Sequence, residues 1–166
     1  MTRLALPVLA LALALPGGAR AQAAFQRPDC PPADAPMKAE ARCIRDVRKR
    51  WQDSNFAALQ ETGLMFIYMA RPDPESSPAA RAAVEQKVEG SFTVKFDVAK
   101  DGTVYNVRTQ DVTGGIEPLA RLWADTITQW TFTKIDQPVT DVAFRRIYLY
   151  PRDGEAKSPQ DSTDAH

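Results

Sequence analysis

The sequence predicts an α+β protein in which residues 88–150 follow the order β-β-α-β. Two patterns predict this order: apolar residues that alternate with polar ones, as in strands with one buried face, and apolar residues at helical intervals between such strands. The first strand shows the alternation clearly. Residues 92–98 place four apolar side chains on one face, namely Phe92, Val94, Phe96 and Val98.

A hairpin and a helix follow this first strand. Asp101 and Gly102 form a short turn, with glycine where a positive φ is favoured, and residues 103–112 are rich in β-branched residues and tyrosine. Pro118 then fits the first turn of a helix. The helix has one apolar face, made of Leu119, Leu122, Trp123, Ile127 and Trp130. Because this face must be covered, we expect both of its tryptophans in the core.

The third strand is predicted over residues 139–150, after a turn at Gln137 and Pro138. Its residues of one parity include Val142, Phe144, Tyr148 and Tyr150. A further helix over residues 79–87 is expected to precede the first strand, and residues 71–78, with three prolines, form a linker before it.

These residues together resemble the C-terminal domain of the TonB family. The resemblance lies in Glu89-Gly90 leading into residues 92–98, in residues 101–107, in the pair Trp130 and Phe132 after the helix, and in Pro138-Val139 before the last strand. It covers residues 78–150, under half of the chain, with the motifs in the family's order and spacing.

The resemblance implies a small two-layer domain in the periplasm, with helices against a three-stranded antiparallel sheet. It also implies that the last strand lies at the sheet edge and pairs with an extended peptide of an outer-membrane TonB-dependent transporter, by β-augmentation. The partner-binding residues predicted on this strand are Val142, Phe144, Arg145, Arg146 and Tyr148. The two arginines either limit nonspecific pairing, which we favour, or meet acidic residues of the partner.

Residues 1–23 are predicted to be a secretory signal peptide. Arg3 precedes an apolar run over residues 4–15, and cleavage fits after either Ala21 or Ala23. The run is shorter than the roughly 20 residues needed to span a bilayer, so we expect no transmembrane anchor after cleavage. The resemblance implies that a TonB energy transducer has a membrane anchor and a long proline-rich spacer. We expect neither of them in this chain. We predict a periplasmic location.

Residues 24–77 are predicted to form a helical extension with a Cys30–Cys43 disulfide, since an exported pair is usually bridged. We expect one helix capped by Asp34 and a second capped by Ser54 that ends near Gly63. Residues 64–70 are consistent with a buried strand or a helix end, and we favour helix. The tail over residues 151–166 is polar and predicted to be disordered.

The sequence offers little for catalysis or for cofactors. The chain has 21 basic residues (lysine and arginine) and 21 acidic residues (aspartate and glutamate), so its net charge is zero. No overall positive charge is therefore present to attract nucleic acid. The single histidine is His166 at the end of the tail, which argues against imidazole chemistry. A calcium loop at residues 97–108 is not expected, because Ala99 and Arg108 stand at ligand positions. We predict no enzyme, no metal and no cofactor.

Paired carboxylates such as Asp97 with Asp101, or Asp111 with Glu117, are interpreted as solvated turn residues. The leading hypothesis is therefore a periplasmic binding protein that pairs its last strand with a peptide of an envelope or transport partner. The alternative is a structural or assembly subunit of a cell-envelope complex without energy transduction. An exposed edge strand is compatible with a monomer or a strand-exchanged homodimer.

Overall fold

The computed structural model describes residues 24–30 and 37–152. Its elements are α1 (Met37–Glu61), β1 (Phe66–Tyr68), the short 3₁₀ helix η1 (Pro74–Ser76), α2 (Pro78–Glu85), β2 (Gly90–Val98), β3 (Val104–Gln110), α3 (Glu117–Ile127), β4 (Thr131–Phe132) and β5 (Val139–Tyr148). The predicted α+β class is confirmed. The predicted signal peptide, Asp34 and the tail beyond residue 152 lie outside the described residues.

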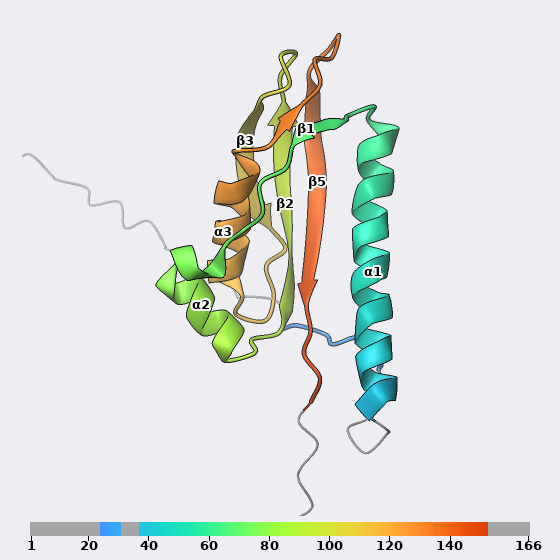
Figure 1. The fold of residues 1–166 in the computed structure, drawn as a ribbon, viewed down its shortest axis with the longest axis vertical. Helices are drawn as coiled ribbons and strands as arrows, with labels where there is room; N and C mark the ends of the chain where they lie inside the picture. The colour runs from blue at the N-terminus through green and yellow to red at the C-terminus, as the bar shows by residue number, and fades with distance from the viewer. Residues whose placement is uncertain (1–23, 31–36, 153–166) are drawn as a thin grey trace, which may run out of the picture.

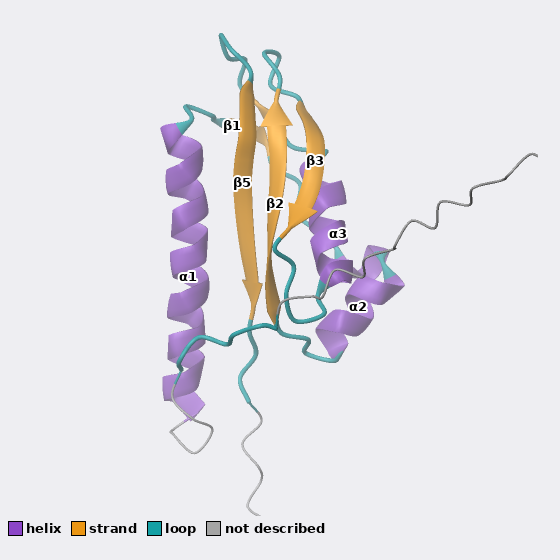
Figure 2. Ribbon diagram, turned by 180° about the vertical axis from the view of Figure 1, so that it is seen from behind, coloured by secondary structure: helices purple, strands orange, loops and turns teal. Residues whose placement is uncertain are grey.

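The main sheet has the strand order β3-β2-β5, and both neighbouring pairs are antiparallel. Val94 at the centre of β2 lies opposite Thr109 of β3 and Phe144 of β5. The apolar face predicted for β2 is confirmed, because its four apolar side chains are at most 1% exposed, but the opposite face is partly covered too, since Thr93 and Asp97 are 8% and 6% exposed. α3 covers the face of the sheet that carries these side chains (Figures 1 and 2).

Trp130 forms the centre of this core, directly after α3. Its ring is 1% exposed and makes edge contacts with Phe66, Phe96 and Phe144 at centroid distances of 5.2, 6.0 and 5.2 Å. Trp123 is also buried, at 8% exposure. The prediction that both tryptophans belong to the core is confirmed.

Residues 37–61 form one continuous helix, α1, so the expectation of a second helix capped by Ser54 is wrong. The buried face of α1 carries the apolar residues Ile44, Val47 and Leu59 together with the polar residues Glu40 and Asn55. This packing stabilises the helix through Ser54, where side-chain capping alone favours a break. The helix does end before Gly63, whose φ is +72°.

Residues 64–70 do not continue the helix, contrary to the interpretation favoured from sequence. β1 lies within this run and pairs antiparallel with β4, with Phe66 opposite Phe132. Leu64 is 5% exposed and faces the core, whereas Met65 and Ile67 are 64% and 69% exposed. Burial alternates only from Leu64 to Ile67, since Tyr68 and Met69 are exposed as well, and the sequence did not reveal the strand because the exposed residues of this run are also apolar.

α1 lies beside β5, along the outer edge of the sheet (Figures 1 and 2). A second apolar cluster joins Ile44 and Val47 of α1 to Ile147 and Leu149. The predicted disulfide is confirmed: Cys30 and Cys43 are bonded, with 5.7 Å between their Cα atoms. Within the described ranges, no helix combines the length and the apolar character needed to cross a membrane.

Candidate functional site

β5 is the terminal strand of the main sheet, and the side chain of Asn55 covers its outer edge. The Nδ2 atom of Asn55 donates to the carbonyl oxygen of Arg145, and the backbone N–H of Arg145 donates to Oδ1 of Asn55, both at 2.8 Å. Asn55 is 5% exposed. One side-chain amide thus takes both backbone groups that a pairing strand would use at this position.

Side chains also bond to the backbone just beyond the end of β5. The carbonyl oxygen of Leu149 accepts a hydrogen bond from the Arg48 guanidinium. The carbonyl oxygen of Tyr150 accepts a hydrogen bond from Arg27 at 3.0 Å. The backbone N–H of Tyr150 donates one to the Glu89 carboxylate at 2.7 Å. Side chains of the described residues thus bond to the backbone at Arg145 of β5 and at Leu149 and Tyr150 beyond it.

The predicted partner-binding residues lie on two faces of β5. Val142 is 5% exposed and belongs to the core beneath α3. Phe144, Arg146 and Tyr148 also face α3, whereas the side chain of Arg145 is exposed on the other face. The alternation of a strand accounts for this division.

Trp123 of α3 holds three of these side chains together. Its ring centroid lies 5.0 Å from that of Phe144 and 4.8 Å from the guanidinium carbon of Arg146. Its indole N–H donates a 2.8 Å hydrogen bond to the hydroxyl of Tyr148. Sequence reasoning assigned Trp123 to the core only, since helical spacing does not reveal a polar contact with a strand that follows later in the chain.

These side chains line a cavity of ≈ 450 Å³, which we call the aromatic groove. It lies between α1, β5, α3 and the segment after β1, and its wall includes Phe56, Met69, Trp123, Phe144, Arg146 and Tyr148. A smaller hollow of ≈ 280 Å³ adjoins it and shares Gln52, Arg146 and Tyr148. The contribution of α1 was missed from sequence, because nothing in its pattern indicates which strand it flanks.

The aromatic groove is positively charged. Arg71 and Arg146 line it, and no aspartate or glutamate is among its lining residues. The Nε atom of Arg146 is buried and has no hydrogen-bond partner among the described residues. The two guanidinium charges of Arg71 and Arg146 make the groove chemically suited to an anionic acceptor, above all a carboxylate.

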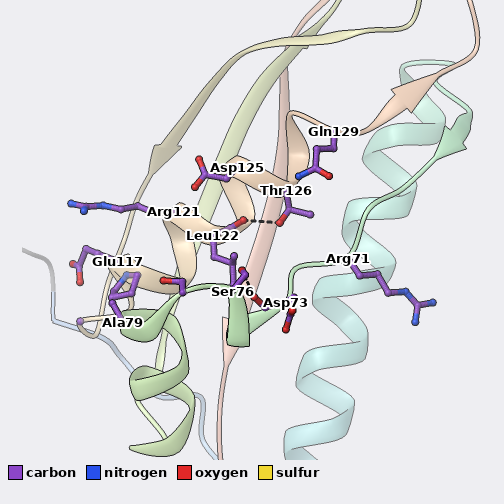
Figure 3. Close-up of a pocket in the computed structure, with 13 residues that line it drawn as sticks. Arg71, Asp73, Ser76, Ala79, Glu117, Arg121, Leu122, Asp125, Thr126 and Gln129 are labelled. Atoms are coloured by element: carbon purple, nitrogen blue, oxygen red, sulfur yellow. Dashed lines mark hydrogen bonds between the residues drawn. The ribbon is translucent and has the colours of Figure 1, made fainter.

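A larger and more polar cavity of ≈ 840 Å³ lies between η1, α2 and α3 (Figure 3). Its lining includes positively and negatively charged side chains, namely Arg71, Asp73, Glu117, Arg121 and Asp125. Figure 3 shows Arg71 and Arg121 pointing outward in opposite directions. Asp73 accepts a 3.0 Å hydrogen bond from the N–H of Glu75 and thereby caps η1. These side chains do not converge on one point.

Asp97 is buried rather than solvated, so its interpretation as a solvated turn residue is wrong. Its side chain accepts hydrogen bonds from Asn106 Nδ2 at 2.7 Å and from the backbone N–H of Asp141 at 2.8 Å. These two bonds, followed by the charge of Arg108, hold the pKa of Asp97 below its ordinary value. The carboxylate thus fastens both neighbouring strands to β2, where the strand register shifts.

The other three carboxylates considered from sequence, Asp101, Asp111 and Glu117, lie in separate places. Asp101 accepts hydrogen bonds from the N–H and hydroxyl of Thr103 and stabilises the hairpin turn. Asp111 and Glu117 line two different cavities. Across residues 24–30 and 37–152, no group of three histidine, cysteine, aspartate or glutamate side chains is arranged to hold a metal ion.

No protein-family model matches this chain, and no curated protein matches it either. The resemblance of residues 78–150 to the TonB family therefore stays a prediction.

Proposed function

We propose that this protein is a binding module of the bacterial cell envelope that holds a peptide segment of another envelope protein through β5. A periplasmic location and an outer-membrane transporter as partner belong to the same proposal, and the resemblance of residues 78–150 supports them. The Cys30–Cys43 disulfide supports an oxidising compartment outside the cytoplasm. No catalytic step is part of the proposal.

The pair formed by Asn55 and Arg145 carries the proposal. The backbone of a terminal strand is bonded here by one side-chain amide, at 2.8 Å in both directions, in place of a neighbouring strand. A peptide strand that replaces Asn55 restores both hydrogen bonds, so the exchange leaves no backbone group of Arg145 unpaired. α1 therefore acts as a cover that an incoming strand displaces locally at Asn55.

Photocrosslinking in cells tests this proposal, with a photoreactive residue in place of the exposed Arg145. We compare the Asn55→Ala background with Gln60→Ala, a change at an exposed position of the same helix. Loss of the amide removes two hydrogen bonds of the cover, each worth about 1 kcal/mol, so adduct yield is expected to rise severalfold in Asn55→Ala only. An unchanged yield in Asn55→Ala, or no adduct in any background, contradicts strand pairing at β5.

The exposed surface around β1 favours the alternative, an assembly subunit of an envelope complex. It carries four large apolar side chains at 41–69% exposure: Met65, Ile67, Tyr68 and Met69. Such patches are typical of surfaces that contact other proteins. Ile67→Glu is expected to abolish partner recovery if this patch docks, whereas Gln137→Glu, which adds the same charge at an exposed turn, leaves recovery intact. Recovery that survives Ile67→Glu contradicts the alternative.

A further inference from the structure

We propose that the aromatic groove binds a peptide segment in which an acidic side chain lies between large apolar side chains. The inference goes beyond strand pairing at β5, because the contacts come from side chains in the groove and α1 stays in place. The groove lies where four separate segments meet, so its shape depends on the whole fold.

The apolar part of the ligand is defined by the walls of the groove. Phe56 of α1 and Met69 after β1 are 45% and 41% exposed, although both line the cavity. Trp123 and Phe144 pack against each other at a centroid distance of 5.0 Å and line it as well. The volume of ≈ 450 Å³ lies within the range of about 300–1,000 Å³ that is usual for ligand sites. Aromatic or branched aliphatic side chains of a ligand fit these surfaces.

The acidic part is defined by two arginines. Arg146 stacks on Trp123 at 4.8 Å, which orients its guanidinium, and its buried Nε has no hydrogen-bond partner among the described residues. Arg71 adds a second positive charge, and no carboxylate of the protein lines the groove to neutralise either. A ligand carboxylate in the groove accepts charge-assisted hydrogen bonds from these guanidinium groups, which are stronger than those that a neutral amide accepts.

A peptide fits the groove better than an acyl chain does. The side chains of Gln52 and Tyr148 are interspersed among its apolar residues, and they can bond to peptide N–H and C=O groups. An acyl chain would bury these polar groups without partners, which is unfavourable. The partial exposure of Phe56 and Met69 also leaves the groove open at its side, so that a longer chain can continue past it.

The test uses the purified, oxidised protein and immobilised pentapeptides with Glu or Gln at the centre and Phe, Leu or Trp on both sides. The best pair is then titrated in solution and followed by tryptophan fluorescence. We expect the Glu peptide to bind at least about tenfold more tightly than its Gln counterpart. Arg146→Gln and Arg71→Gln are expected to remove this preference. Arg145→Gln is the matched control, because the neighbouring arginine on β5 points to the other face.

Three results would overturn the proposal: equal binding of Glu and Gln peptides, loss of preference in Arg145→Gln, and tighter binding of dodecanoate than of any peptide. Arg71 is exposed, so its substitution tests the groove even if Arg146→Gln loses stability. These measurements do not use the backbone edge of Arg145. A negative result therefore leaves the crosslinking test of strand pairing unaffected, and the two proposals fail separately.

Discussion

The indole N–H of Trp130 donates a 2.9 Å hydrogen bond to the carbonyl oxygen of Ala70, which precedes it by 60 residues. Both residues are buried, at 1% and 8% exposure. The bond fastens the segment between β1 and η1 to the core and fixes one side of the aromatic groove.

Trp130→Phe keeps most of the packing but leaves the carbonyl oxygen of Ala70 without its donor. We expect the free energy of unfolding to fall by about 1–3 kcal/mol, the usual effect of a buried unpaired group. Urea denaturation measures this loss. Tyr105→Phe removes a hydroxyl from a side chain that is 45% exposed, and it should change stability by less than about 0.5 kcal/mol. Equal stability of Trp130→Phe and the parent protein would contradict this prediction.

Asp97 gives the protein a defined response to acid. Because the folded-state pKa of Asp97 is lowered from 3.8, its contribution to stability is complete above that value and is lost as pH falls through the lowered pKa. Denaturation at pH 7 and at successive values below 4 should show the parent's advantage over Asp97→Asn shrinking with acid. Asp136→Asn, at an exposed position, should show no such trend. An advantage that grows as pH falls would contradict the assigned direction.

Gly102 and Gly63 provide a matched comparison of steric and conformational effects. Both have positive φ, +89° and +72°, but a Cβ at Gly102 would lie 2.0 Å from the carbonyl oxygen of Phe132, whereas one at Gly63 meets nothing within 4 Å. Gly63→Ala should lower stability by about 1 kcal/mol through backbone strain alone. Gly102→Ala should lower it by about 3 kcal/mol or more, because backbone must move. Similar melting temperatures for the two variants would contradict this.

The Cys30–Cys43 disulfide should stabilise the protein by about 3 kcal/mol, the value that the chain-entropy model gives for a loop of this length. Thermal unfolding with and without a reducing agent measures the difference. The double variant Cys30→Ser, Cys43→Ser should melt like the reduced protein and should not respond to the reductant. An unchanged melting temperature after reduction would contradict this prediction, because the disulfide would then not restrict the conformations of the unfolded chain.

The main sheet and α3 could be predicted from sequence because their buried residues recur at a regular local period. Phe92, Val94 and Phe96 alternate on β2 and are almost completely buried. Leu119 and Ile127 of α3 are likewise buried at helical spacing. In these elements local pattern and tertiary burial agree, so the pattern is sufficient.

The remaining features depend on contacts between distant segments. β1 exists because Phe66 pairs with Phe132, and α1 continues through Ser54 because its apolar face packs along β5. Asn55 bonds to a residue 90 positions away, and no local pattern marks it as the cover of a strand edge. The aromatic groove draws residues from four segments, so it becomes visible only after they are assembled in space.

The position of α1 beside β5 also determines the order in which the chain can complete its fold. The helix is synthesised early, but Ile44 and Val47 find their apolar partners only once Ile147 and Leu149 exist. The disulfide joins residues only 13 positions apart and can close long before that. Contacts that span most of a chain form slowly and leave apolar surface open in the meantime. The apolar side chains of Ile44 and Val47 therefore stay without these partners until the last strand has been made.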